Sequence, residues 1–260
     1  MEINKIYNEN CLDTMNRMVD NFIDLTVTSP PYDNLREYKG YSFDFENIAK
    51  ELYRVTKVGG IVVWIVGDAT IKGSESGTSF KQALYFKEIG FNLHDTMIYQ
   101  KNAYPFPPSN RYFNVFEYMF ILSKGIPKTT NLIKVKNKAK KNKKTSFRKV
   151  DGLIKNTFVK GNETKVKDNI WLYKVGFNQS STDKISFEHP AIFPEKLVAE
   201  HIHSWSNEGD LVFDCFMGSG TTAKMSHIYK RNWIGSELSK NYIDIANKRL
   251  SLYINQTSLF

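Results

Sequence analysis

The 260-residue chain has few cysteines and no long apolar run, and both absences limit what it can be. Its two cysteines, Cys11 and Cys215, offer no disulfide framework, no zinc-ligand spacing and no Cys-x-x-Cys pair, so we expect a reducing cytoplasm as its compartment. It contains no stretch of about eighteen apolar residues, and its N-terminus lacks the apolar core of a signal peptide. We therefore expect neither a membrane span nor secretion.

Acidic residues are scarce in one segment. Between residues 124 and 174, fifteen lysines and Arg148 stand against three acidic residues, a net charge of +13 in a chain whose total is +9. The rest of the chain is therefore net −4. Within the segment, residues 134–149 hold eight lysines and one arginine with no acid, too much charge to bury.

Aromatic residues interleave with these basic residues further along the segment, at Phe147, Phe158, Trp171, Tyr173 and Phe177. Basic groups neutralise phosphates, and aromatic and polar side chains touch bases, so residues 125–185 are predicted to bind nucleic acid. The contacting residues are expected to be Lys138, Lys140, Lys141, Lys143, Lys144 and Arg148. A solvated loop is the alternative.

Apolar, β-branched runs alternate with segments of helical periodicity over the rest of the chain. Strands are expected at 22–27, 61–66, 91–100, 114–123, 211–216 and 233–235, and helices at 45–57 (closed by Gly59-Gly60), 80–89, 194–205 and 241–250. This alternation predicts an α/β fold with a mostly parallel sheet, in which 114–123 pairs antiparallel with the strand before it. Length and a hydrophobic content of 41% favour one domain with an insertion.

The most specific local motif is Thr28-Ser29-Pro30-Pro31-Tyr32, which follows the first of these buried strands. Two prolines cannot donate to a ladder, so the strand ends there and the loop is stiff. Open α/β sheets bind ligands at this carboxyl edge. The Ser29 hydroxyl and the Pro30 carbonyl accept hydrogen bonds beside the flat ring of Tyr32, a set suited to an amino group on a flat heterocycle. A rigid turn without a ligand is the alternative.

A second motif lies far along the chain. The strand at 211–216 runs into the glycine-containing segment 217–223, and the next strand ends at Glu237. Glycines let the backbone approach a ligand, and a carboxylate at the end of the next strand accepts from ribose hydroxyls. The Gly-x-Gly-x-x-Ala spacing also fits a dinucleotide such as NAD. Hydride transfer has no use for an amino-group clamp, however, so the first motif argues against NAD.

Together these motifs resemble those of the S-adenosylmethionine-dependent DNA amino-methyltransferases. Residues 28–32 resemble catalytic motif IV, 214–222 motif I, 234–237 motif II, 189–197 motif X, and 117–124 the segment before the target-recognition region. The order, with the catalytic loop first and the cofactor loop last, is that of the β group. The resemblance implies a doubly wound, Rossmann-like sheet of seven mostly parallel strands with one antiparallel strand. It implies a catalytic half (1–124), a target-recognition insert (125–185) and a cofactor half (186–260).

The resemblance also implies the site. Ser29, Pro30, Pro31 and Tyr32 form its catalytic part: Ser29 and the Pro30 carbonyl accept the two amino hydrogens, and Tyr32 stacks on a base flipped out of the duplex. The residues implied for S-adenosylmethionine are Asp13, Phe193 (methionine-side wall), Asp214, Phe216, Gly218, Gly220, Thr221, Thr222 and Glu237 (ribose). Double-stranded DNA is the implied partner, and the resemblance leaves a homodimer and a cognate restriction endonuclease open.

Single residues and the order of the motifs indicate the target base and argue against other activities. Serine at the first catalytic position is commoner in N4-cytosine members and aspartate in N6-adenine members, so cytosine is expected and adenine is the alternative. Cytosine C5 methylation would need a Pro-Cys dipeptide, and the sequence has none. A glutamine or RNA methyltransferase would place the cofactor motif first, and a non-catalytic DNA-binding protein is more remote. His201 and His203 face apart on a helix, so we expect packing or solvation and no metal site.

Overall fold

The structure is a computed structural model that describes residues 1–31, 43–102, 110–138, 143–159, 161–176, 179–188 and 192–254. The chain divides into two compact units, one of Met1–Asn131 with Asn169–Phe260 and the other of Leu132–Asp168. The first unit contains the central sheet. The second lies wholly within the segment predicted to bind nucleic acid.

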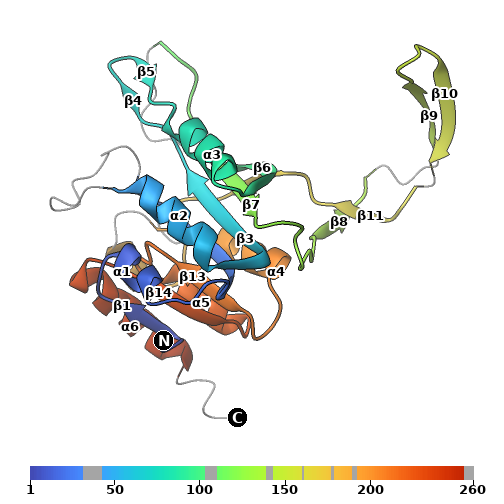
Figure 1. The fold of residues 1–260 in the computed structure, drawn as a ribbon. Coiled ribbons are helices and arrows are strands. Elements are labelled where there is room, and N and C mark those ends of the chain that lie inside the picture. Colours follow the sequence, from blue (N-terminus) through green and yellow to red (C-terminus); the bar gives the residue numbers. More distant parts are fainter. Residues whose placement is uncertain are drawn as a thin grey trace. The chain divides into compact units, whose positions relative to one another are not determined.

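An eight-stranded sheet forms the centre of the first unit (Figure 1). Its strands, in spatial order, are β1 (Lys5–Tyr7), β14 (Asn232–Ser236), β13 (Leu211–Asp214), β2 (Ile23–Thr28), β3 (Thr56–Val66), β7 (Phe116–Ser123), β6 (Asn92–Lys101) and β12 (Ile170–Tyr173). Of these eight, β7 alone runs antiparallel to its neighbours. The predicted mostly parallel, Rossmann-like sheet with one antiparallel strand is confirmed, and β12 adds one strand to the seven expected.

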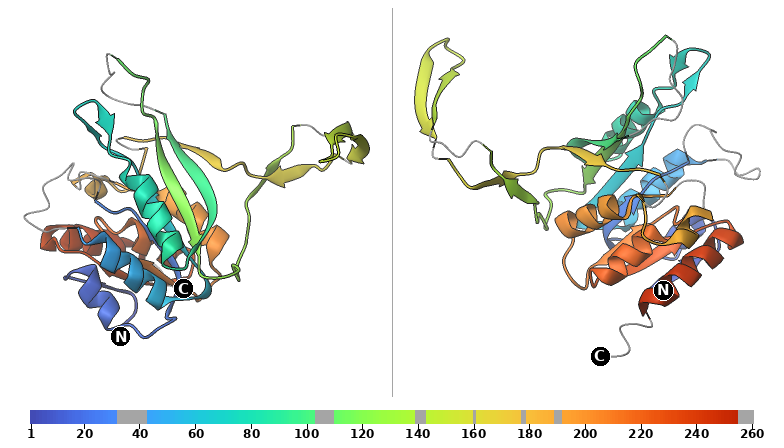
Figure 2. Two further views of the ribbon diagram at one scale, coloured as in Figure 1. Left: turned by 45° about the horizontal axis from the view of Figure 1, so that its top comes forward. Right: turned by 180° about the vertical axis from the view of Figure 1, so that it is seen from behind.

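Helices cover both faces of this sheet, as the opposite views in Figure 2 show. One face carries α1 (Cys11–Asn16), α2 (Phe45–Val55) and α3 (Thr78–Glu88), and the other carries α4 (Glu195–Trp205), α5 (Thr221–Ile228) and α6 (Lys240–Ile254). A short hairpin, β4 (Thr70–Ile71) and β5 (Ser74–Glu75), precedes α3, and the 3-10 helix η1 (Lys184–Glu188) precedes α4. Because helices shield both faces, the run Ile61–Val66 of β3 is buried throughout, as is typical of parallel sheets. No described helix combines the length and the apolar character needed to cross a membrane.

The junction between α2 and β3 differs from the prediction. The helix was expected to run to Lys57 and to be closed by Gly59-Gly60, but it ends at Val55, and both glycines lie inside β3. Their backbones exchange hydrogen bonds with Lys124 at 2.6 and 3.1 Å. A Cβ at Gly60 would lie 2.9 Å from the Asp24 carbonyl oxygen, so glycine serves a close approach of two strands there.

The chain connections change direction between β13 and β2. From β13 the chain passes through α5 to β14, whereas from β2 it passes through α2 to β3 on the opposite side. Neighbouring parallel strands whose connections leave in opposite directions form a topological switch point, and ligands of such sheets bind beyond the carboxyl ends of those strands. The loops after Thr28 and Asp214 follow the carboxyl ends of these two strands.

The second unit consists of two small antiparallel ribbons. β8 (Lys134–Lys136) pairs with β11 (Thr164–Val166), and β9 (Lys143–Arg148) pairs with β10 (Ile154–Val159). Among the described residues, neither ribbon pairs with a third strand.

Candidate active site

The two predicted loops meet at the carboxyl ends of β2 and β13. These strands pair in parallel, with Val212 opposite Leu25 and Phe213 opposite Thr26. The register brings Thr28, the residue before Ser29, beside Asp214, and Thr28 Oγ1 donates to Asp214 Oδ1 at 2.7 Å. The segments 28–31 and 214–222 are therefore neighbours in the fold although they are almost two hundred residues apart.

Asp214 joins the two loops through its side chain. Its Oδ2 accepts from Thr222 Oγ1 at 2.6 Å, and its Oδ1 also accepts from the Phe216 backbone N–H at 3.0 Å. Burial raises the pKa of this carboxyl, and the hydrogen bonds from Thr222, Thr28 and the Phe216 N–H oppose the rise. The carboxylate lies under the glycine loop with its hydrogen bonds directed to the protein itself, which is the arrangement of a positioning residue.

The glycine loop, Met217–Gly220, is shaped by its glycines and by contact with β14. Gly218 and Gly220 have φ of 52° and 80°, and Gly220 is the N-cap of α5. A Cβ on Gly220 would lie 2.8 Å from the Ala246 Cβ, so the loop can pass this close to α6 only with glycine there. The Met217 N–H donates to the Ser236 carbonyl at 2.9 Å, which ties the loop to the end of β14.

The Glu237 side chain accepts hydrogen bonds from the glycine loop and from the residues that follow β14. Its Oε2 accepts from the Gly218 N–H at 2.9 Å and its Oε1 from the Ser239 N–H at 2.8 Å. Burial raises the pKa of Glu237, and the two backbone donors oppose the rise. A carboxylate fixed beside a glycine turn is suited to the hydroxyls of a ribose, because each oxygen keeps a further lone pair.

The other predicted cofactor residues lie around this centre. Thr221 and Thr222 are buried in the first turn of α5, and Phe216 is half-buried, with its ring centroid 5.8 Å from that of Phe43. Phe193 is half-buried just before α4, and Asp13 is exposed in the first turn of α1. Among the described residues neither of these two is hydrogen-bonded to the glycine loop.

The catalytic segment is described only in part. Ser29 and Pro31 are half-buried and Pro30 is buried, at the end of β2. Tyr32 lies outside the described residues, and its stacking role stays a prediction.

A buried cluster of four charged side chains, which we call the charge cluster, is hydrogen-bonded to the glycine loop. It consists of Asp183, Glu195, Lys224 and Arg249. The exposed fractions of the two cationic side chains are 2% and 0%, and those of Asp183 and Glu195 are 8% and 13%. Paired opposite charges allow this burial because each compensates the desolvation of another.

Arg249 connects the charge cluster to the loop. Its Nε donates to Asp183 at 2.6 Å, and its Nη1 donates to the Ser219 carbonyl at 3.1 Å and to Thr221 Oγ1 at 2.9 Å. This residue was not predicted from the sequence. The signal was present in α6, where Arg249 follows the buried Ile245 and Ala246 by four and three residues and so falls on the buried face.

Two buried side chains, Cys215 and His201, could in principle act as a nucleophile and a metal ligand. Cys215 is a buried free thiol, and burial raises its pKa well above the usual value. His201 is buried, and its ring stacks on Trp171 with centroids 4.8 Å apart, so the expected packing role is confirmed. His203 is exposed.

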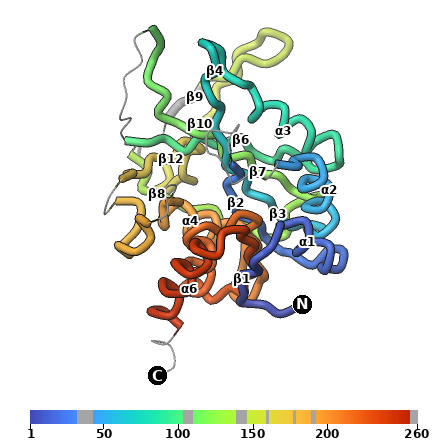
Figure 3. Tube along the Cα trace, turned by 90° about the vertical axis from the view of Figure 1, so that its left-hand side faces the viewer, coloured from blue at the N-terminus to red at the C-terminus, as the bar shows by residue number. Residues whose placement is uncertain are grey.

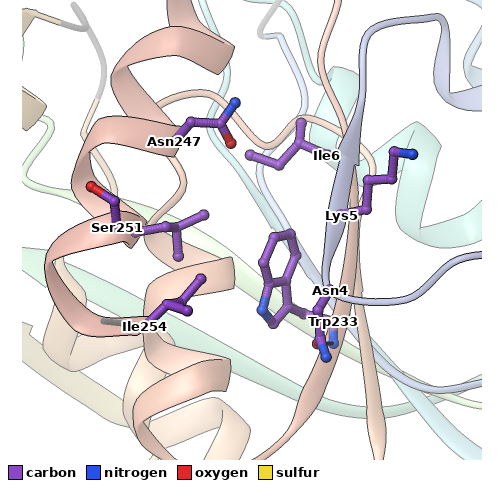
Figure 4. Close-up of a pocket in the computed structure, with 8 residues that line it drawn as sticks. Asn4, Lys5, Ile6, Trp233, Asn247, Ser251 and Ile254 are labelled. Atoms are coloured by element: carbon purple, nitrogen blue, oxygen red, sulfur yellow. Dashed lines mark hydrogen bonds between the residues drawn. The ribbon is translucent and has the colours of Figure 1, made fainter. Parts of the chain in front are cut away.

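A surface pocket lies near the amino ends of β1 and β14, away from the carboxyl ends where the two loops lie. Lys5, Ile6 and Trp233 line it from the starts of β1 and β14, and Asn247 and Ile254 line it from α6 (Figure 4). Figure 3 shows β1 and α6 side by side at this place. Because the pocket is at the amino ends of the strands, it is separate from the loops that follow Thr28 and Asp214.

Of the residues predicted to contact nucleic acid, two have described side chains. Lys138 and Arg148 are both exposed in the second unit. Lys143 and Lys144 lie in β9, with side chains outside the description, and Lys140 and Lys141 lie outside the described residues.

A topological switch point with a proline loop and a glycine loop side by side is typical of α/β enzymes that bind a nucleotide-type cofactor. A protein-family model described as DNA methylase, of the N6/N4 methyltransferase type, matches residues 23–248. The chain belongs to this family, and it is therefore an S-adenosylmethionine-dependent DNA amino-methyltransferase that acts on N4 or N6 groups.

Individual relatives agree with this assignment. The chain is 63% identical over 240 residues to the orphan methyltransferase M.BamHII of Bacillus amyloliquefaciens, covering 89% of this chain and 90% of that protein. Its fold is similar to that of the PvuII cytosine-N4-specific DNA methyltransferase, with a TM-score of 0.70, 20% identity and coverage of 94% and 84%. It is also similar to M1.HpyAVI in its S-adenosylmethionine complex, with a TM-score of 0.65, 22% identity and coverage of 95% and 98%.

Proposed function

We propose that this protein transfers a methyl group to the N4 amino group of a cytosine flipped out of double-stranded DNA, in the cytoplasm. The observation that carries the proposal is the Asp214 carboxylate, which accepts from Thr28 Oγ1 at 2.7 Å and from Thr222 Oγ1 at 2.6 Å. Ser29 follows Thr28 directly, and Thr222 belongs to the helix that the glycine loop opens. A base held by the first loop thereby faces a donor held by the second.

The described residues fit S-adenosylmethionine. Gly218 and Gly220 keep side chains out of the turn, and the Glu237 carboxylate is fixed where it can accept from ribose hydroxyls. The half-buried rings of Phe216 and Phe193 offer apolar contact to the cofactor. When bound, S-adenosylmethionine supplies an electrophilic methyl group on a sulfonium sulfur.

The residues after β2 prepare the acceptor. The amino nitrogen of cytosine is conjugated with its ring and is a poor nucleophile. Ser29 Oγ and the Pro30 carbonyl would accept its two hydrogens and leave the nitrogen lone pair directed at the methyl group for in-line transfer. As the nitrogen–carbon bond forms, the methyl–sulfur bond would break to leave a neutral thioether, and the methylated nitrogen would release one of its two hydrogens as a proton. Tyr32 stacks on the flipped base and holds it in this orientation. No covalent enzyme intermediate is needed.

The choice of cytosine rests on Ser29. Serine at this position is commoner in the N4-cytosine branch of the family, and the likeness in fold to a cytosine-N4-specific enzyme is compatible with it. Adenine N6 is the second candidate, because the same pair of acceptors fits either amino group.

Nucleoside analysis of methylated DNA tests the proposal. The protein is incubated with S-adenosylmethionine and unmethylated genomic DNA, and the digested nucleosides are identified by mass spectrometry. We expect N4-methylcytosine. N6-methyladenine would overturn the choice of base, and the absence of both products would overturn the catalytic assignment.

We also propose that the lysines of the second unit bind DNA phosphates. Replacing Lys140, Lys141, Lys143 and Lys144 with glutamine is expected to weaken DNA binding equally for all sequences. The slope of log affinity against log salt should flatten by about one for each phosphate that the protein no longer neutralises. The measurement is a salt titration of DNA affinity. The control is replacement of the exposed Lys50 and Lys87, on helices of the first unit, and an unchanged slope in the quadruple variant would contradict the assignment.

A further inference from the structure

The β9–β10 ribbon has a defined register and a defined turn. Arg148 pairs with Ile154 and Ser146 with Asn156. At the turn the Lys149 N–H donates to the Leu153 carbonyl at 2.8 Å, and Gly152, with φ of 80°, donates its N–H to the Lys149 carbonyl at 2.9 Å. The ribbon is therefore held in one register, and each of its described side chains belongs to one of two faces.

Directly opposed residues of a ribbon share a face, so the pairing divides the side chains into two sets. What we call the amide face carries Arg148, Ile154, Ser146, Asn156 and Phe158 among the residues with described side chains. What we call the threonine face carries Phe147, Lys155 and Thr157. On the amide face, Ser146 Oγ donates to Asn156 Oδ1 at 2.6 Å, which orients the amide, and no described residue accepts from the Asn156 side-chain N–H groups.

The ribbon exposes apolar side chains within a strongly basic segment. Phe158 is 77% exposed, Ile154 63% and Phe147 54%. An isolated pair of strands is marginally stable in water, so exposed apolar groups on it point to a partner that covers them. The eight lysines and one arginine of residues 134–149 indicate that this partner is a polyanion. Apolar and basic groups together match the base edges and phosphates of DNA.

The dimensions of the ribbon match the major groove. The groove of B-DNA admits a two-stranded ribbon. Side chains two residues apart on one face are separated by about 6.8 Å, which is close to the rise of two base pairs. Arg148 lies two residues from Ser146, the cross-strand partner of Asn156. These two positions therefore address base pairs about two steps apart.

We propose that the β9–β10 ribbon enters the DNA major groove and reads the target sequence with its amide face, through Arg148 and the Ser146-oriented Asn156. Guanidinium and amide groups are planar and can make two hydrogen bonds to one base in a fixed geometry, which the single hydroxyl of Thr157 on the threonine face cannot. The lysines that flank the ribbon contact phosphates. This inference rests on the proposed DNA methylation and assigns sequence choice to named residues.

Matched alanine variants on the two faces test the proposal. The wild-type recognition sequence is first mapped by sequencing methylated genomic DNA, and each variant is then assayed on duplexes that carry every single-base change. We expect Asn156→Ala and Arg148→Ala to lower methylation of the cognate duplex roughly 10- to 100-fold, and each to relax the preference at one base pair. The two relaxed positions should be about two steps apart. Thr157→Ala, on the threonine face, should keep both rate and preference.

Several results would overturn the assignment. An Asn156→Ala enzyme with wild-type sequence preference would exclude base reading by the amide face, and an equal loss in Thr157→Ala would exclude the distinction between faces. A change of oligomeric state in Phe158→Ser, with unchanged DNA affinity, would make the ribbon a protein–protein contact. Failure of the wild-type protein to methylate any DNA would instead refute the proposed function, so the two failures are distinguishable.

Discussion

Replacing Arg249 with methionine is expected to lower the free energy of unfolding by about 3–5 kcal/mol. The guanidinium is fully buried, and its loss leaves the Asp183 and Glu195 carboxylates with Lys224 as their remaining partner in the charge cluster. The variant also loses the donors to the Ser219 carbonyl and Thr221 Oγ1, so affinity for S-adenosylmethionine should fall as well. Urea unfolding and calorimetric titration with the cofactor measure the two effects.

The same variant should change the dependence of stability on pH. Burial raises the pKa of Asp183 and of Glu195, but hydrogen bonds, led by those from Lys224, hold both below their ordinary values of 3.8 and 4.5. In the wild type the carboxylates therefore stabilise the fold above those values, and this stabilisation is lost as the pH falls through the depressed native pKa values. Without Arg249 the effect of burial is less opposed, and the native pKa values move upward.

The variant consequently regains stability relative to the wild type on acidification. The difference in unfolding free energy should be largest near about pH 7 and should narrow toward about pH 4. Lys240→Met is the matched control, because its ion pair with Asp244 is on the same helix but exposed, and it should change stability by less than about 1 kcal/mol. Arg249→Lys keeps the charge and should recover part of the loss. A pH-independent difference would show that Arg249 acts by packing alone.

The features predicted from sequence are those with a local pattern. Strand β3 contains the continuous apolar run Ile61–Val66, and β2 alternates apolar residues with Asp24, Thr26 and Thr28. The two loops are marked by Pro30-Pro31 and by Gly218 and Gly220. Such segments specify their own conformation, because proline narrows and glycine widens the range of φ angles that the backbone can adopt. Both loops follow parallel strands of one sheet, and the Thr28–Asp214 hydrogen bond shows that they lie side by side.

The features that were missed depend on partners distant in sequence. β12 joins the sheet because Trp171 and Tyr173 are buried at its edge beside β6, which composition alone could not indicate within a basic segment. The charge cluster draws its members from η1 and its flanks, α4, α5 and α6. A lysine such as Lys224 is usually solvated, and only the fold brings two carboxylates to it.

Thr28→Val is expected to reduce methyl transfer at saturating cofactor and DNA about 10- to 100-fold. The substitution preserves shape but removes the hydroxyl that donates to Asp214, the link between Ser29 and the glycine loop. A displacement of about 1 Å between reacting groups is sufficient for a loss of this size. The buried carboxylate also loses a donor, which should cost about 1–3 kcal/mol of stability. Single-turnover rates and urea unfolding give the two values.

Thr26→Val is the matched control for this bridge. Thr26 is buried on the same strand and the same face, and its hydroxyl has no hydrogen-bond partner among the described residues. Its replacement should therefore leave stability unchanged or slightly higher and leave the rate unchanged. A purely structural role of Thr28 would lower stability but spare the rate of the folded enzyme. A rate loss at saturation in Thr28→Val, with wild-type behaviour in Thr26→Val, is the outcome specific to a bridge that aligns acceptor and donor.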